Sequence, residues 1–486
     1  MIRITAVVLA VFGVRLRIDA GTLCGRILDA ENGTKYASFR GVPYGKPPVG
    51  HRRFKAIEPW DGLLDARAEG PACPQKDFYY GHLPLQPKGS SEDCIYLNLH
   101  IPQEVASSEH VVNGRCLPIL VMIHGGGFQS GSGLTDLHGP EYLIAKGVIV
   151  ITFNYRINVI GFLSLNSKEV PGNQGLRDMV TLLRWVQRNA RAFGGDPDNV
   201  TLMGQSAGST CVHLLSLSKA AEGLFKNFVP VVEHKYPGVT TILDQDPLAL
   251  IAQGRGSQYP MFISYVNKET EFFRWIALSL DQVRRVNEDP KLLLPIRFLY
   301  NLPEAKQEML ADEFYKKCFK SGVNLDNYLM FLGYTFFKYP TLKVAEWRSI
   351  CGAQTYLHRF TYNSERSVLK KAIWTPYEGA AHVEDLTYVF RVNSLLGNEA
   401  SFPPKNNDDK MKDWMTTLVT NFMRCGDPTC GLAVSQWPSV SPDNIEYQNI
   451  AEPMVYQMMS PSQDEIDMVD FLDSLDKEIR YLCFKI

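Results

Sequence analysis

Long apolar runs, C-x-x-C pairs and an excess of one charge are all missing from this chain of 486 residues. Beyond the N-terminus, no stretch approaches the ~18 consecutive apolar residues of a transmembrane helix, so no membrane anchor is expected. Lys and Arg number 50, Asp and Glu number 52, and the formal net charge is −2. Because neither sign is concentrated, neither a nucleic-acid-binding surface nor a polybasic membrane tether is expected.

The ten cysteines include no C-x-x-C pair, and no paired histidines accompany them. Structural metal sites use such spacings, so no metal is expected, and no motif indicates an organic cofactor. The hydrophobic fraction of 45% and the charged fraction of 21% are typical of a globular protein with a sizeable core.

The N-terminus carries one arginine before a short apolar stretch, and small residues follow it at a plausible cleavage position. This pattern predicts a secretory signal peptide over residues 1–13, a secreted protein and a single domain over 14–486. A first β-strand is the alternative interpretation of the same residues. Asn32 and Asn199 each begin an N-x-Thr sequon and are candidate glycosylation sites if the chain is exported.

Apolar runs rich in β-branched residues alternate with helical periodicity in the first half of the chain. The runs predict strands buried on both faces, and the periodic segments predict helices. The expected order is strand 118–124, strand 148–155, helix 176–190, strand 199–203 and helix 209–225. This alternation predicts an α/β fold whose central, twisted, mostly parallel sheet is flanked by helices.

The pentapeptide Gly204-Gln205-Ser206-Ala207-Gly208 lies between the last of these strands and the last helix. A serine on such a sharp turn, with glycines two residues before and after, is typical of a nucleophile elbow. We therefore predict that Ser206 is the nucleophile. A serine hydroxyl also needs a base, an orienting acid and donors for an oxyanion.

Three consecutive glycines follow the strand at 118–123, in the sequence His124 to Phe128. Such a run lets backbone N–H groups converge on one anionic oxygen. We predict that the oxyanion donors are Gly126, Gly127 and Ala207, the residue next to the nucleophile. His124 is interpreted as structural.

Four histidines follow Ser206 in the chain, which is where this fold class places the catalytic base. His213 lies on the same helix as the serine, His234 borders a loop, and His358 lies in a strand-like stretch. His382 follows small residues and precedes a helix-like segment, so we predict that His382 is the general base.

Several blocks of this chain resemble the type-B carboxylesterases, the cholinesterase-like α/β-hydrolases, and are closest to insect esterases of the antennal and juvenile-hormone-esterase-like kinds. They are FRGVPYGKPPVGHRRF (39–54), SEDCIYLNLHIP (91–102), HGGGF (124–128), the stretch from GNQGLRD to GQSAG (172–208) and GAAHVEDLTYVF (379–390). The resemblance implies an α/β-hydrolase fold, a small-molecule ester substrate and an acyl-enzyme mechanism.

The same resemblance assigns roles that spacing alone does not. It implies that the acid is Glu269, with Glu271 two residues further on as the competitor. It also implies a disulfide between Cys73 and Cys94, and two structural ion pairs, Arg53 with Glu92 and Arg156 with Asp178.

Two departures from the family pattern bear on function. Gln205 stands where cholinesterases have a glutamate, which favours a neutral ester over a choline ester. The second departure is that a family strand is missing after residue 226. Either this is a shortened form of an ordinary esterase, or residues such as 228–232 fill the gap. The alternatives to an active esterase are therefore a catalytically impaired form and a non-catalytic, cholinesterase-like binding protein.

Overall fold

The fold is that of a computed structural model, in which the described residues form two compact units. The structure describes residues 13–52, 62–76, 89–106, 116–165, 167–225, 242–243, 245, 247–274, 278–294, 302–319, 322–364, 367–373, 377–393, 402, 405–432 and 437–483. The first unit comprises Met1–Tyr259, Val389–Ser401 and Thr416–Gly426, and the second comprises Pro260–Tyr388, Phe402–Met415 and Asp427–Ile486. Nearly all of the predicted signal peptide lies outside the described residues.

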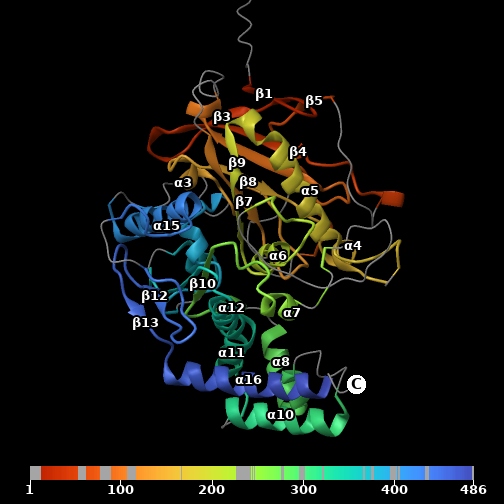
Figure 1. The fold of residues 1–486 in the computed structure, drawn as a ribbon, viewed down its shortest axis with the longest axis vertical. Coiled ribbons are helices and arrows are strands. Elements are labelled where there is room, and N and C mark those ends of the chain that lie inside the picture. Colours follow the sequence, from red (N-terminus) through yellow and green to blue (C-terminus); the bar gives the residue numbers. More distant parts are fainter. Residues whose placement is uncertain are drawn as a thin grey trace, which may run out of the picture. The chain divides into compact units, whose positions relative to one another are not determined.

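The first unit is built on a six-stranded sheet with the order β3-β4-β6-β8-β7-β9 (Figure 1). Its strands are β1 (Arg15–Ile18), β2 (Gly21–Cys24), β3 (Arg26–Asp29), β4 (Lys35–Pro43), β5 (Gly62–Asp65), β6 (Tyr96–Pro102), β7 (Leu117–Ile123), β8 (Ile149–Phe153) and β9 (Gly195–Gly204). Its helices are α1 (Gln103–Ala106), α3 (Glu141–Ile144), α4 (Asn158–Phe162), α5 (Gln174–Asn189), α6 (Ala207–Ser216) and α7 (Pro247–Ala252). Strands β1, β2 and β5 form a separate three-stranded sheet.

The strands predicted around the elbow are present and parallel. β7 pairs in parallel with β8 on one side and with β9 on the other. β3, β4 and β6 add antiparallel pairings, which makes the sheet mixed. All five residues of β8 are buried, as expected for a strand covered on both faces.

The helix after the elbow is shorter than predicted, because α6 ends at Ser216 and not near residue 225. The hydroxyl of Ser218 accepts a hydrogen bond from the N–H of Ala220, 3.2 Å away. A serine side chain that binds nearby backbone groups competes with continued helix, and residues 219–223 form turns. The apolar periodicity of this stretch reflects burial of its side chains and not further helix.

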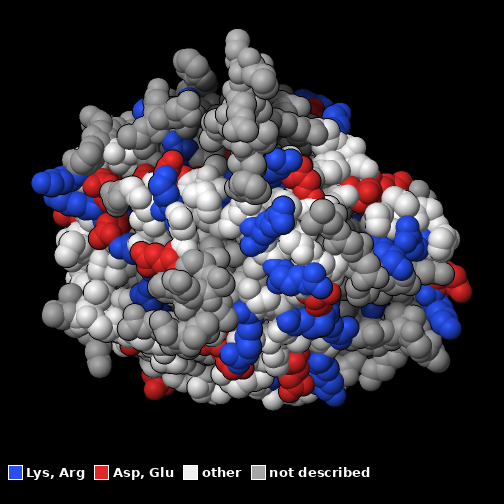
Figure 2. Space-filling model, turned by 90° about the horizontal axis from the view of Figure 1, so that it is seen from above, with Lys and Arg blue, Asp and Glu red and all other residues white. Residues whose placement is uncertain are grey.

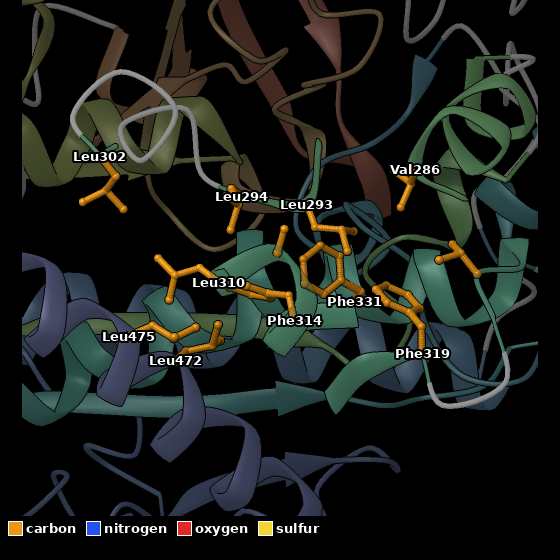
Figure 3. Packing of buried hydrophobic residues seen from close by; sticks show 12 residues of the cluster. Val286, Leu293, Leu294, Leu302, Leu310, Phe314, Phe319, Phe331, Leu472 and Leu475 are labelled. Atoms are coloured by element: carbon orange, nitrogen blue, oxygen red, sulfur yellow. The ribbon is translucent and has the colours of Figure 1, made fainter. Parts of the chain in front are cut away.

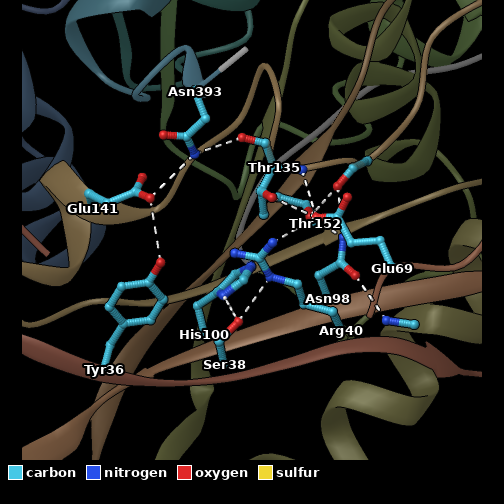
Figure 4. A network of polar contacts seen from close by, with 12 residues as sticks. Tyr36, Ser38, Arg40, Glu69, Asn98, His100, Thr135, Glu141, Thr152 and Asn393 are labelled. Atoms are coloured by element: carbon cyan, nitrogen blue, oxygen red, sulfur yellow. Dashed lines mark hydrogen bonds and ion pairs between the residues drawn. The ribbon is translucent and has the colours of Figure 1, made fainter. Parts of the chain in front are cut away.

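Buried polar side chains of the first unit form two hydrogen-bonded groups. The ion pair between Arg156 and Asp178 is fully buried, with Arg156 Nε 2.7 Å from Asp178 Oδ2, as the resemblance predicts. A second network contains Tyr36, Ser38, Arg40, Glu69, Asn98, His100, Thr135, Glu141, Thr152 and Asn393 (Figure 4). Arg53, the predicted partner of Glu92, lies outside the described residues.

The second unit contains a four-stranded sheet with the order β10-β11-β12-β13. Its elements are β10 (Met261–Val266), α8 (Leu278–Glu288), α10 (Glu304–Cys318), α11 (Leu325–Gly333), α12 (Tyr339–Ile350), β11 (Thr355–Phe360), α13 (Val368–Ile373), β12 (Tyr447–Ile450), β13 (Met458–Met459) and α16 (Gln463–Cys483). A π-helix over Tyr334–Lys338 joins α11 to α12, and α15 (Asn407–Cys425) has residues in both units.

Apolar side chains from α8, α10, α11 and α16 form a core of their own in the second unit (Figure 3). Phe314 lies at its centre, 5.8 Å from the ring of Phe331 and 5.4 Å from the ring of Phe471. Figure 1 shows α10 and α16 side by side, as this packing requires.

Between β9 and β10, the described residues contain no strand. β9 is an edge strand of the six-stranded sheet, and β10 is an edge strand of the four-stranded sheet. The predicted gap after residue 226 falls at residues 226–241, which lie outside the described part of the chain, so the missing family strand stays a prediction.

None of the described helices is both long enough and apolar enough to cross a membrane. Basic and acidic side chains are interspersed on the face shown in Figure 2.

Candidate functional site

Ser206 lies at the abrupt turn between β9 and α6, with φ 54° and ψ −123°. A residue with a side chain rarely adopts this backbone conformation, which costs on the order of 1–3 kcal/mol and is typical of functional sites. The two glycines of the pentapeptide make the turn possible. A Cβ on Gly204 would come within 2.3 Å of the carbonyl oxygen of Gly208, and one on Gly208 would come within 2.1 Å of that of Ile123.

The loop from His124 to Gly131, here named the glycine loop, lies against this turn. The N–H of Gly125 donates to Oε1 of Gln205, 3.0 Å away. Gly126 and Gly127 have φ values of 107° and 61°, and a Cβ on Gly126 would clash with the carbonyl oxygen of Ser130. Only glycine fits here without strain, which explains the sequence run.

Three backbone N–H groups in this region have no hydrogen-bond acceptor among the described residues. They belong to Gly126, Gly127 and Ala207. Ala207 is the first residue of α6, where helix N–H groups have no partner within the helix and favour negative charge. The sequence predicts the same three groups as donors to an oxyanion, and this role stays a prediction.

His382 and Glu269 form a close pair in the second unit. Nδ1 of His382 lies 2.7 Å from Oε2 of Glu269, and Oε1 of the same carboxylate accepts from the N–H of Val266 at 2.8 Å. The side chains are 15% and 5% exposed, so little solvent screens the interaction. Both carboxylate oxygens are engaged, which fixes the orientation of the Glu269 carboxylate that faces Nδ1 of His382.

Backbone contacts between two loops hold this pair in place. The N–H of Lys268 donates to the carbonyl oxygen of Ala380 at 3.0 Å. Oδ1 of Asn267 accepts from the N–H of Ala380 at 2.9 Å. A Cβ on Gly379 would meet the Asn267 side chain at 2.3 Å, so glycine allows this close approach.

Aromatic rings cover the imidazole of His382. Phe337, on the π-helix, lies 4.7 Å from it between ring centroids, and Phe273 lies 6.5 Å away in a stacked orientation. A π-helix turn frequently marks a functional site, and here it carries Phe337 to the histidine.

The other predicted candidates are placed elsewhere. Glu271 is paired with Arg274, 2.6 Å from its Nε, while Glu269 contacts the histidine. His358 is buried in β11 against the rings of Phe262 and Trp437, and desolvation lowers its pKa to about 3. His213 lies on α6, and His234 lies outside the described residues.

Two features near these groups were not predicted from the sequence. Burial, and then the charge of Glu269, raise the pKa of Asp385 to about 6, and the hydroxyl of Ser264 donates to its Oδ2 at 3.1 Å. Gln205 was considered only as a substrate determinant, whereas its carboxamide joins the elbow to the glycine loop. No local signal indicates these contacts, since their partners are about 80 to 120 positions apart.

Four cysteines of the described part of the chain are disulfide-bonded. Cys73 and Cys94 form a disulfide with a Cα–Cα distance of 4.9 Å, as the resemblance predicts. Cys425 and Cys430 are also disulfide-bonded. In the described part of the chain, no three His, Cys, Asp or Glu side chains are grouped so that they could hold a metal ion.

Comparison with known proteins gives consistent matches over most of the chain. A model of the carboxylesterase family matches residues 13–231 and 226–468, and the two stretches meet where the sequence predicts a missing segment. Juvenile hormone esterase of Heliothis virescens is 40% identical over 94% of this chain and 93% of its own. A carboxylic ester hydrolase of Bombus ignitus is 27% identical over 95% and 94%.

A solved structure agrees with these relatives. The crystal structure of juvenile hormone esterase from Manduca sexta, with OTFP covalently attached, superimposes with a TM-score of 0.89. It is 42% identical in sequence and covers 96% of this chain and 99% of its own. This similarity shows that the chain has an α/β-hydrolase fold and that it hydrolyses carboxylic esters.

Proposed function

The chain belongs to the carboxylesterase family and is a carboxylic ester hydrolase, and from this premise we propose that it cleaves neutral esters through an acyl-enzyme on Ser206. The observation that carries the proposal is the strained turn at Ser206 beside three unpaired N–H groups. Strain of this kind exposes the hydroxyl at the end of a strand, and the N–H groups supply the donors that acyl transfer needs.

The proposed reaction has two halves, and each transfers the acyl group once. The hydroxyl oxygen of Ser206 attacks the ester carbonyl while Nε2 of His382 accepts its proton. The tetrahedral oxyanion is held by Gly126, Gly127 and Ala207, and collapses as His382 donates that proton to the leaving alcohol. Water then attacks the acyl carbonyl while His382 accepts its proton. As this second tetrahedral oxyanion collapses, His382 returns the proton to the oxygen of Ser206, which releases the carboxylic acid and restores the serine hydroxyl.

Glu269 is proposed as the acid that orients the base. Its Oε2 accepts from Nδ1 of His382, which leaves Nε2 unprotonated and ready to accept a proton. The negative carboxylate also stabilises the imidazolium that forms during the reaction. Ser206 belongs to the first unit and the His382–Glu269 pair to the second, so their cooperation has to be tested in solution.

The proposed substrate class is a neutral ester. Gln205, next to the nucleophile, carries no charge, and its carboxamide is engaged by the backbone of Gly125. No ammonium-binding carboxylate therefore stands at this position. The similarity to two juvenile hormone esterases makes juvenile hormone the first natural ester to assay.

Secretion and glycosylation are part of the proposal. Residues 1–13 are proposed as a signal peptide, and Asn32 and Asn199 as acceptors. Of the two, Asn32 is the better candidate, because Asn199 lies within β9 and its Oδ1 is buried. Expression in insect cells tests this: the protein should reach the medium without residues 1–13 and lose mass on treatment with an N-glycosidase.

Burst kinetics test the acyl-enzyme. Mixing the protein with an activated nitrophenyl ester should release a rapid burst of nitrophenol, about one equivalent per Ser206, before a slower steady state. Ser206→Ala should abolish both phases. A folded protein that hydrolyses the ester without any burst, at rates that Ser206→Ala leaves unchanged, would contradict the mechanism. A folded protein without hydrolysis would indicate the impaired or binding form.

A further inference from the structure

Residues 71–75, which include Cys73 of the Cys73–Cys94 disulfide, are hydrogen-bonded to the end of the glycine loop. Oε1 of Gln75 accepts from the N–H of Gly131 at 2.8 Å, and Nε2 donates to the carbonyl oxygen of the same residue at 2.9 Å. Nε2 also donates to the carbonyl oxygen of Cys73, at 3.2 Å. A single carboxamide therefore pairs with both backbone groups of Gly131, as a neighbouring strand would.

Asn158, the first residue of α4, makes a second connection between the same two segments. Its N–H donates to the carbonyl oxygen of Phe128 at 2.8 Å. Its Nδ2 donates to the carbonyl oxygen of Gln129 at 2.8 Å and to that of Pro74 at 3.2 Å. The residue has a φ of 56°, which asparagine tolerates better than most residues.

The chain on either side of the oxyanion donors is thus fixed at several points. On the N-terminal side, Gly125 is bound by Gln205. Beyond the loop, the N–H of Gly133 donates to Oδ1 of Asn154 at 2.8 Å, and Nδ2 of Asn154 donates to the carbonyl oxygen of Pro71 at 2.9 Å. Gln75 supplies the anchor where the glycine loop ends, at Gly131.

We propose that Gln75 is a positioning residue for ester hydrolysis, which rests on the function proposed above. Together with Asn158 it holds the glycine loop so that the N–H groups of Gly126 and Gly127 reach the oxyanion. The Cys73–Cys94 disulfide fixes the segment that carries Gln75. No part of Gln75 contacts the substrate in this proposal, and its effect is transmitted through Gly131.

The expected magnitude follows from the geometry that oxyanion donors need. Donors act at about 2.7–3.1 Å from the oxyanion, and removal of one lowers kcat by roughly 100- to 1,000-fold. Loss of the anchor displaces donors without deleting them, so we expect a decrease in kcat of about tenfold or more. KM should change little, because the ground-state ester makes weaker use of these donors.

Gln75→Met is the test variant, since methionine has a similar length but neither donates nor accepts here. Gln187→Met is the matched control: Gln187 is also half-buried, and its Nε2 donates to the carbonyl oxygens of Pro197 and Leu224 at 2.8 and 3.1 Å. Gln75→Met loses three hydrogen bonds to the backbone and Gln187→Met loses two, but only Gln75 contacts the glycine loop.

The measurements are kcat and KM for an activated nitrophenyl ester, the inhibition constant of a trifluoromethyl ketone, and the thermal midpoint. The ketone adds to the serine hydroxyl as a tetrahedral oxyanion and so reports on the donors. In Gln75→Met, kcat and ketone affinity should fall by similar factors, and Gln187→Met should retain both. If the wild-type protein hydrolyses the ester and Gln75→Met has the same kcat and ketone affinity as Gln187→Met, this inference is overturned while the proposed function stands.

Asn158→Gly provides a second test that does not depend on the folding of Gln75→Met. Glycine adopts the left-handed backbone without steric cost, and the change removes only the Nδ2 donor. The same joint decrease in kcat and ketone affinity is expected. Wild-type kinetics in Asn158→Gly would overturn the inference, and an inactive wild type would overturn it together with the proposed function.

Discussion

Replacing Glu269 by glutamine tests the acid–base pair at the atom where it acts. The glutamine oxygen can still accept from the N–H of Val266, so the loop should retain its conformation. Its NH₂ group then faces Nδ1 of His382, which must become an acceptor and move its proton to Nε2. In that tautomer Nε2 cannot accept a proton from serine.

The size of the effect follows from this loss of tautomer and charge. The corresponding exchange in a serine-protease triad lowers kcat by about 10⁴-fold, which equals about 5.5 kcal/mol of barrier. The pair here is close, at 2.7 Å, and largely shielded from solvent, so we expect a decrease of roughly 10³- to 10⁴-fold in Glu269→Gln.

Steady-state kinetics with an activated nitrophenyl ester measure the effect, with Glu271→Gln as the control. Glu271 has the same chemistry two positions away but pairs with Arg274, so its variant should keep wild-type kcat. Refutation would be a Glu269→Gln protein that folds and hydrolyses the ester within a few-fold of wild type. A large loss in Glu271→Gln instead would reassign the acid.

Three further predictions concern stability, each measured by urea unfolding. His358 has a pKa of about 3 in the folded protein and about 6.5 when unfolded. Its contribution to the free energy of unfolding is therefore complete above pH 6.5 and is lost as the pH falls. Between pH 7 and pH 5, the free energy of unfolding should decrease by about 2 kcal/mol less in His358→Phe than in wild type. Phe314→Ala should cost about 3–5 kcal/mol, and a loss below about 1 kcal/mol would contradict the packing of the helical core. Arg156→Leu should cost about 3–5 kcal/mol because it leaves Asp178 buried and unpaired, and Asp178→Leu added to it should restore much of the loss.

The elements around the nucleophile could be predicted because their signals are local. β7, β8, β9 and α5 follow from apolar runs and periodicity, and the glycines at 126 and 204 mark turns where a Cβ would clash. The predicted end of the helix after the elbow was wrong: α6 ends at Ser216, and beyond it the side chain of Ser218 binds the backbone in place of further helix. Local hydrogen bonding of this kind is not visible in periodicity.

Contacts between distant segments could not be predicted from spacing. His382 and Glu269 are 113 positions apart, and Gln75 and Gly131 are 56 apart. The resemblance supplied the first pair, because it carries information on tertiary contacts that one sequence lacks. Nothing in the sequence indicated that Gln75 and Gln205 bind the glycine loop, since a glutamine is equally suited to the surface.

Covalent labelling with a fluorophosphonate tests most directly the claim that Ser206, His382 and the oxyanion donors act together. Intact mass should show one adduct on the wild-type protein, none on Ser206→Ala, and labelling slowed by several orders of magnitude in His382→Ala. A protein that is folded by circular dichroism but remains unlabelled, or one labelled equally in Ser206→Ala, would contradict the account.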